Sequence, residues 1–181
     1  MPGREILTIG HSTHELDTFV GLLASNRVET LADVRRHPGS RRLPHFNAGP
    51  LGDALEAAGI AYRAFGEELG GRRSPLPDSP NGGWREEQFQ GYADHMQGAE
   101  FAAGVARLEA LAIERRAAYM CAEGDWRRCH RRLLSDGLEL RGWRVLHVLR
   151  DGAREPHELT PFAVRDGTAL SYPPAQRELG V

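Results

Sequence analysis

Lysine is absent from this chain, and all 23 of its basic residues are arginine. Without lysine, the protein has no residue for Schiff-base chemistry, no lysine general base and no lysine-bearing phosphate loop. A base composition that favours arginine codons is sufficient to account for this absence, so the arginines do not by themselves indicate a function. Any anion recognition must depend on arginine, histidine and backbone amides.

Cysteine is scarce, long apolar runs are missing and neither sign of charge dominates. The two cysteines, Cys121 and Cys129, predict reduced thiols and no disulfide framework. No stretch approaches the roughly 18 apolar residues of a membrane span, and the first residues show no apolar signal region. The formal net charge of -2 argues against a uniformly basic surface for nucleic acid. We therefore expect a soluble, cytoplasmic protein with no membrane partner.

Short apolar segments alternate with segments of helical periodicity along most of the chain. The predicted strands are residues 6–9, 30–35, 60–65, 117–122 and 144–149. The predicted helices are residues 16–23, 50–58, a region from about 86 that is best defined at 101–112, and 128–140, with a Gly- and Pro-rich loop at 70–83. This alternation predicts an α/β class: a single-domain, three-layer fold with a mostly parallel sheet of about five strands, Rossmann-like or flavodoxin-like. Residues 1–150 are expected to form the α/β domain, and residues 151–181 a C-terminal tail or irregular cap of the same domain.

Polar groups of chemical interest follow four of the predicted strands. They occur at residues 10–12, 33–35, 65–67 and 121–123, and an arginine-rich cluster at 127–132 opens the helix after Cys121. Because the carboxyl ends of parallel strands meet at one edge of a sheet, we expect these groups to lie close together. The sequence therefore predicts a functional site at this edge.

Four of these residues are candidates for catalysis. His11 titrates near neutral pH and suits proton transfer, although a surface histidine near a helix end has the same pattern. Cys121 is a candidate nucleophile beside a helix N-terminus, with a buried, inert cysteine as the alternative. Glu123 is a charged residue placed for acid–base work or for orienting an arginine or histidine. His130 adds a second imidazole at the helix start.

A second group of residues is predicted to hold an anionic substrate. Asp33 and Arg35 form either an ordinary ion pair or a pair that faces a ligand, and Ser12 has the capping-box spacing to Glu15 that predicts a helix cap. The substrate-binding candidates are Ser12, Asp33, Arg35, Arg41, Cys129 and Arg131. Guanidinium groups bind phosphate bidentately, and arginines cluster at residues 35–42 and 127–132; two solvated basic faces are the alternative. The nearby aromatics Phe46, Trp84 and Trp126 are candidates for stacking on a base.

Zinc is the metal that the cysteines and histidines would suit, but their spacing is not that of a zinc knuckle, nor is it the Cys-x-x-Cys redox spacing. We predict no metal site and no cofactor.

Five short motifs occur in order along the chain: GHS at residues 10–12, DVR at 33–35, LGG at 69–71, CAE at 121–123 and CHR at 129–131. This order resembles the domain-of-unknown-function family 488, and the resemblance extends from about residue 6 to residue 147. It implies a fold and a set of signature residues but no particular reaction.

Three functions are compatible with these residues. The first is an enzyme, a hydrolase or a transferase, that acts on a small phosphate-bearing substrate such as a nucleotide, or on nucleic acid. The second is a non-catalytic nucleotide or nucleic-acid binding module, which needs the arginines and aromatics alone. The third is a metal-dependent hydrolase.

Overall fold

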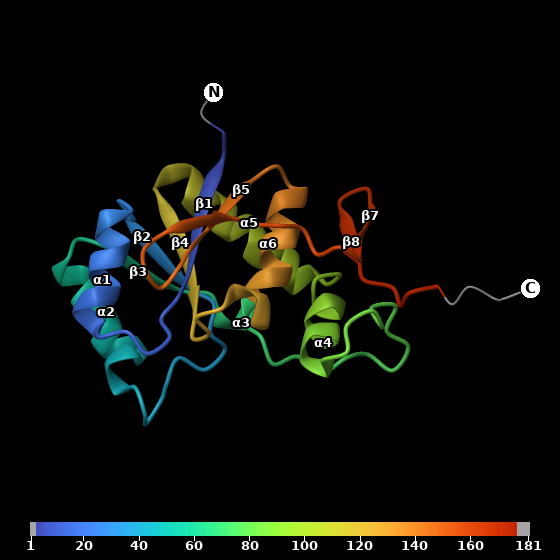
Figure 1. Cartoon of the computed structure of the whole chain (residues 1–181), viewed down its shortest axis with the longest axis horizontal. Helices are drawn as coiled ribbons and strands as arrows, with labels where there is room; N and C mark the ends of the chain where they lie inside the picture. The colour runs from blue at the N-terminus through green and yellow to red at the C-terminus, as the bar shows by residue number, and fades with distance from the viewer. Residues whose placement is uncertain (1–2, 177–181) are drawn as a thin grey trace, which may run out of the picture.

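The computed structural model describes residues 3–176 of the chain (Figure 1). The helices within these residues are α1 (Leu16–Ser25), α2 (Ala48–Ala57), α3 (Gly66–Leu69), α4 (Glu87–His95), α5 (Ala99–Glu114) and α6 (Arg131–Leu140), with 3-10 turns η1 (Pro44–Phe46) and η2 (Trp126–Arg128). The strands are β1 (Glu5–Gly10), β2 (Thr30–Asp33), β3 (Ala61–Ala64), β4 (Ala117–Cys121), β5 (Arg144–Val148), β6 (Arg154–Pro156), β7 (Val164–Asp166) and β8 (Ala169–Ser171).

Six of these strands form one sheet in the order β3-β2-β4-β1-β5-β6. Its first five strands are parallel, and β6 pairs with β5 in the antiparallel direction. The predicted α/β class with a mostly parallel sheet is confirmed. The placement of β4 between β2 and β1 distinguishes this order from those of the Rossmann and flavodoxin sheets.

The segment after residue 150 contributes regular structure that the sequence pattern did not predict. Arg154–Pro156 forms the sixth strand of the sheet, and β7 and β8 pair as a separate hairpin. Each of these strands is only three residues long, too short for an alternating pattern to stand out. Part of the predicted irregular cap is therefore an edge of the sheet.

The helices cover the sheet on both faces, which gives three layers. Phe19 of α1 and Leu51 of α2 pack with Leu7 and Ile9 on one face, whereas helices α4, α5 and α6 pack on the other face around Tyr119. Figure 1 shows α1 and α2 together on one side of β1 and β4, with α5 and α6 on the opposite side. Because strand side chains alternate between faces, both sides of β1 and β4 are buried and largely apolar.

The connections leave the sheet in opposite directions around β4. The chain passes from β1 and β2 into α1 and α2 on one face, and from β4 towards α6 on the other. The neighbours of β4 in the sheet are β1 and β2, and the chain leaves both of them on the opposite face from the segment that follows β4. This divergence opens a crevice at the carboxyl end of β4, which is where α/β proteins bind ligands. Within residues 3–176, no helix combines the length and apolar composition needed to cross a membrane.

The predicted helix cap at Ser12 is wrong. Helix α1 begins at Leu16 with Glu15 as its N-cap residue, and no side chain caps it. Ser12 has a φ of 48°, in the left-handed region, whereas an N-cap residue needs an extended backbone. Its hydroxyl accepts a hydrogen bond from Arg150 instead, at 3.2 Å.

Candidate functional site

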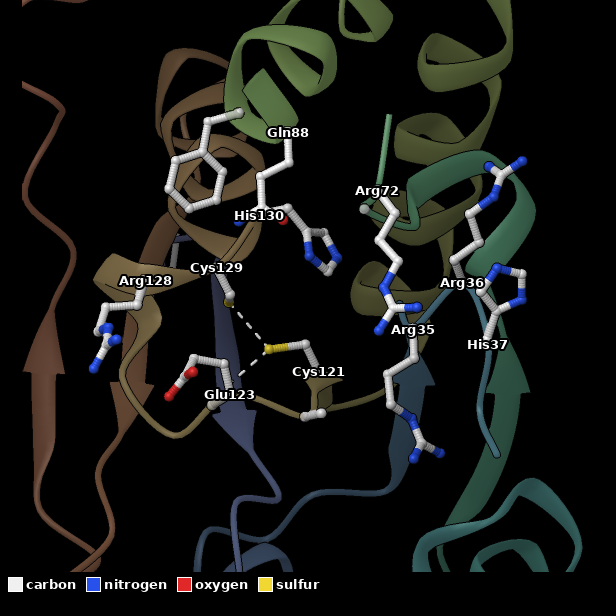
Figure 2. A pocket seen from close by; sticks show the side chains of 13 residues that line it. Arg35, Arg36, His37, Arg72, Gln88, Cys121, Glu123, Arg128, Cys129 and His130 are labelled. Carbon is white, nitrogen blue, oxygen red and sulfur yellow. Dashed lines mark hydrogen bonds between the residues drawn. The ribbon is translucent and has the colours of Figure 1, made fainter. Parts of the chain in front are cut away.

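A cleft of about 200 Å³ opens at the carboxyl edge of the sheet, beside the end of β4 (Figure 2). Its walls come from the segments after β2 and β4, the loop after α3, the start of α4 and the turn before α6. The lining residues are Arg35, Arg36, His37, Gly71, Arg72, Gln88, Phe89, Cys121, Ala122, Glu123, Arg128, Cys129 and His130. The predicted edge of the sheet therefore carries a cleft, and we call it the cleft below.

Two thiols lie side by side in the wall of the cleft. Cys121 ends β4, Cys129 precedes α6, and their Sγ atoms are 3.0 Å apart. Both are buried, free cysteines. The chain brings them together because the η2 turn returns it from the end of β4 towards the same strand. We call Cys121 and Cys129 the thiol pair.

Arg131 is buried directly behind the thiol pair and is only 1% exposed. Its Nε donates hydrogen bonds to Cys121 Sγ at 3.0 Å and Cys129 Sγ at 3.3 Å. The guanidinium also donates to Thr8 Oγ1 at 2.7 Å and to the Glu123 carbonyl oxygen at 2.6 Å. Among residues 3–176, no carboxylate forms an ion pair with Arg131. The charge that remains to balance this buried cation is a thiolate.

Within the thiol pair, the pKa values of the two sulfurs are shifted in opposite directions. Burial by itself raises the pKa of Cys121, but the hydrogen bond from the Cys129 thiol and the positive charge of Arg131 outweigh burial and lower that pKa to about 6. Burial and the adjacent Cys121 thiolate raise the pKa of Cys129 well above its usual value. Cys121 is therefore the thiol of the pair that ionises first, and Cys129 is then the hydrogen-bond donor.

Three arginines stand at the mouth of the cleft with no acidic partner. Arg36, Arg72 and Arg128 are exposed, line the cleft and form no ion pair with any described residue. Figure 2 shows Arg72 and Arg35 on one side of the thiol pair, and Glu123 and Arg128 on the other. We call Arg36, Arg72 and Arg128 the rim arginines. They supply positive charge next to a thiolate in an open site.

Arg35 is held differently, because its charge is already paired. Its Nε and one terminal nitrogen donate to the two carboxylate oxygens of Asp33 at 2.9 and 2.7 Å. Tyr62 donates to the same carboxylate at 2.6 Å, and burial together with this acidic neighbour raises the pKa of Tyr62. Asp33 is buried behind the cleft and does not line it. Of the two predicted arrangements for this pair, the structure contains the ion pair.

The two histidines among the catalytic candidates are both uncharged at neutral pH. Burial lowers the pKa of His130 to about 4, and its Nε2 donates to the Val34 carbonyl oxygen at 3.0 Å. Burial likewise lowers the pKa of His11 to about 4; its ring stacks on Phe46 with centroids 4.3 Å apart. His11 accepts a hydrogen bond from Arg35 at 3.3 Å from behind the cleft and is not part of its lining.

The structure brings half of the predicted site residues into the cleft. The predicted residues that line it are Arg35, Cys121, Glu123, Cys129 and His130. Those outside the lining are His11, Ser12, Asp33, Arg41 and Arg131. Arg131 and Asp33 support the lining from behind, whereas Arg41 is exposed on the loop after β2. The catalytic and binding roles of these residues stay predictions.

Four further residues line the cleft although the sequence did not single them out: His37, Arg72, Gln88 and Phe89. Arg72 comes directly after the LGG motif, inside the Gly- and Pro-rich loop. The composition of this segment predicts a loop but does not indicate a functional site. Gln88 and Phe89 belong to the first turn of α4, where nothing in the pattern separates a cleft wall from ordinary helix surface.

No group of three potential metal-ligating side chains within residues 3–176 has the geometry to hold a metal ion. The donor set that the metal-dependent alternative requires is therefore not found among these residues.

The chain is an α/β protein whose cleft at the carboxyl edge of the sheet combines two buried cysteines, a buried arginine behind them and three exposed arginines at its mouth. A family model described as "Domain of unknown function DUF488" matches residues 15–138, so the chain belongs to this family. The matched range contains the thiol pair and the rim arginines, whereas His11 and Ser12 precede it. No curated protein and no solved structure matches the chain.

Proposed function

We propose that this protein is an enzyme in which the Cys121 thiolate attacks a phosphate-bearing substrate, namely a nucleotide or a component of nucleic acid. The observation that carries the proposal is the buried Arg131, whose nearest anionic partner is the thiol pair. A buried cation without a carboxylate keeps Cys121 ionised, and a thiolate is the nucleophilic form of cysteine.

The rim arginines suit the recognition of a phosphate in front of that thiolate. Guanidinium groups bind phosphate oxygens through paired hydrogen bonds, and unpaired arginines at the mouth of the cleft are free to do so. Their positive charge also offsets the repulsion between a phosphate dianion and a thiolate. Arg35 contributes from the cleft wall, where Asp33 fixes its orientation.

The proposed reaction proceeds in two displacements. In the first, Cys121 Sγ forms a bond to phosphorus, the bond from phosphorus to the leaving oxygen breaks, and the Glu123 carboxyl group gives that oxygen a proton. In the second, the Glu123 carboxylate takes a proton from water as the water oxygen attacks phosphorus. The S–P bond then breaks, which releases phosphate and restores the thiolate. Glu123 suits this role because it is exposed and lines the cleft beside Cys121.

A second hollow of about 450 Å³ adjoins the cleft, and it favours a nucleotide over a smaller ester. The two hollows share Gln88, Phe89 and Arg128 as a common wall. The second hollow adds the partly exposed ring of Phe162 and the guanidinium of Arg132, which lies 5.0 Å from the centre of the Trp84 ring. Aromatic faces and arginines are the groups on which bases and further phosphates bind.

The test of the proposal is turnover of phosphate esters by the purified chain. We expect hydrolysis of para-nitrophenyl phosphate and of nucleoside monophosphates, with lower KM for the nucleotides. Cys121→Ala is expected to abolish turnover, and Glu123→Gln to lower kcat by about 10²-fold or more. Arg63→Gln, an exposed change on β3 away from the cleft, serves as the matched control with unchanged kcat and KM.

Two outcomes would overturn the proposal. Full turnover by folded Cys121→Ala removes the thiolate from the reaction. Nucleotide binding that falls with salt but is unaffected by Cys121→Ala and Glu123→Gln, with no turnover of any ester, identifies a binding module instead.

A further inference from the structure

Cys129 forms no covalent bond in the displacement reaction, yet its Sγ lies only 3.0 Å from that of Cys121. We propose that the thiol pair is an oxidative modification site: a hydroperoxide oxidises Cys121, and Cys129 then closes an intramolecular disulfide that switches the site off reversibly. The disulfide itself rests on geometry alone, and only its effect on activity rests on the proposed function.

The geometry places the two sulfurs close to bonding distance. Their Sγ atoms are 3.0 Å apart, and a disulfide bond is about 2.05 Å long, so closure needs a movement of roughly 1 Å. Cys129 lies in the turn between η2 and α6, outside any regular element. The buried β4 strand fixes Cys121, so the turn is the part of the pair that has to shift.

Both sulfurs are positioned where a small oxidant meets them. Cys121 and Cys129 both line the cleft, which is open to solvent at the rim arginines. Susceptibility to peroxide follows thiolate character and access. Arg131 stabilises a thiolate at Cys121, and the sulfur, although only 3% of the residue is exposed, forms part of the cleft wall. Cys129 keeps its proton and is the resolving thiol.

The first step is a two-electron oxidation of Cys121. The thiolate attacks one oxygen of a hydroperoxide, ROOH, so that an S–O bond forms and the O–O bond breaks. The departing alkoxide takes a proton from solvent and leaves as ROH. Cys121 is now a sulfenic acid, and the peroxide has been reduced.

The second step joins the two cysteines. Cys129 loses its proton to solvent and attacks the Cys121 sulfur, so that the S–S bond forms, the S–O bond breaks and hydroxide leaves to become water. In sum, two thiols and one hydroperoxide give one disulfide, one alcohol and one water. A dithiol reverses the change by thiol–disulfide exchange.

The buried arginine explains why this disulfide is reversible and regulatory, not structural. Oxidation removes the thiolate that balances Arg131, which leaves the guanidinium with neutral partners: Thr8 Oγ1 and backbone carbonyl oxygens. An uncompensated buried charge is costly, so the oxidised form is disfavoured and easily reduced. Labile disulfides of this kind are regulatory more often than structural.

The experiment treats the full, reduced chain with one equivalent of hydrogen peroxide or cumene hydroperoxide and follows intact mass and free thiols. We expect both thiols to disappear, the monomer to lose the mass of two hydrogens, and dithiothreitol to restore both. Cys129→Ala, with Cys129→Ser as a second variant, is expected to stop at a Cys121 sulfenic acid that dimedone captures. In Cys121→Ala, Cys129 is expected to react at least about tenfold more slowly than the wild-type pair.

The proposal is overturned if the wild type yields only a sulfinic acid at Cys121, or a disulfide between two chains. It is also overturned if Cys121→Ala consumes peroxide at the wild-type rate. An internal disulfide in a protein that hydrolyses no ester supports the oxidative site and refutes the proposed function. If peroxide leaves both the ester turnover and the two thiols unchanged, the proposed function is supported and the oxidative site is refuted.

Discussion

Arg131 Nε lies 3.0 Å from Cys121 Sγ and ties the first residue of α6 to the last residue of β4. The guanidinium is buried, and no carboxylate among residues 3–176 pairs with it. The pair accounts for an ionised cysteine inside the protein, because each charge is costly to bury without the other. The chemistry proposed for the cleft depends on this relationship.

Replacing Arg131 with lysine tests whether the guanidinium keeps Cys121 ionised. A single ammonium group cannot donate to both sulfurs, Thr8 and the Glu123 carbonyl together. We expect Arg131→Lys to raise the pKa of Cys121 from about 6 by about one pH unit or more, measured by the ultraviolet absorbance of the thiolate against pH. Arg141→Lys, an exposed change at the end of the same helix, is the control, and the midpoint of its thiolate titration is expected to equal that of the wild type. Equal midpoints for all three proteins would refute this role of Arg131.

Gly10 is required by the close approach of the β4 turn. A Cβ at this position would lie 1.9 Å from the Glu123 carbonyl oxygen and 2.9 Å from an Arg131 nitrogen. We expect Gly10→Ala to lower the free energy of unfolding by about 3 kcal/mol, because neither backbone nor buried guanidinium has room to move. Gly21→Ala is the contrast: its Cβ meets nothing within 4 Å, and alanine in the exposed middle of α1 is expected to stabilise by about 0.5–1 kcal/mol. Urea unfolding of both variants measures this, and a Gly10→Ala protein as stable as Gly21→Ala would contradict it.

The rim arginines are expected to hold the phosphate group. Arg36→Gln, Arg72→Gln and Arg128→Gln should each weaken inhibition by inorganic phosphate by about tenfold, equivalent to about 1.4 kcal/mol. Added salt should weaken phosphate binding to the wild type, and less so to the variants, because the lost contacts are charged. The measurement is the inhibition constant of inorganic phosphate against ester turnover, and the control Arg63→Gln is expected to keep the wild-type constant. Unchanged constants in all three rim variants would place the phosphate elsewhere.

The buried histidine His147 makes stability depend on pH. Its ring stacks on Trp126 with centroids 4.0 Å apart, its Nε2 faces His157 at 3.0 Å, and His157 contacts the buried Asp136 at 2.8 Å. Burial, with the neighbouring His157, lowers the pKa of His147 to about 2, so the folded chain holds it neutral. Its contribution to stability is therefore complete above the unfolded pKa of 6.5 and is lost as pH falls from there towards 2.

His147→Gln is expected to flatten this dependence. Each histidine held neutral costs up to about 1.4 kcal/mol of stability per pH unit below its unfolded pKa. His11 and His130 add to the slope down to about pH 4. The measurement is the free energy of urea unfolding between about pH 6 and pH 4. A variant with the full wild-type slope would show that His147 does not contribute.

The sequence was most informative about which strands exist and about the polar residues at their carboxyl ends. Residues after β1, β2 and β4 do gather at one edge, because parallel strands end together whatever their order. The strand order itself depends on tertiary packing. Cys121, at the end of β4 between β1 and β2, lines the cleft, whereas His11, after β1, does not.

Other parts of the site depend on contacts that no local pattern records. The spacing of Asp33 and Arg35 predicts a shared strand face, but β2 ends at Asp33 and Arg35 turns back to pair with it. The two cysteines lack a recognised redox spacing, yet the η2 turn brings their sulfurs to 3.0 Å. Arg72 completes the rim from a loop whose composition predicts only a loop.

The most direct test of the central claim is capture of the covalent intermediate on Cys121. The wild-type protein is mixed with a nucleoside monophosphate or para-nitrophenyl phosphate, quenched during turnover and digested for mass spectrometry, with Cys121→Ala and Cys129→Ala in parallel. We expect one phosphoryl group on Cys121 in the wild type and in Cys129→Ala, and none in Cys121→Ala. Turnover without any phosphoryl group on Cys121, or with the group on another residue, would contradict it.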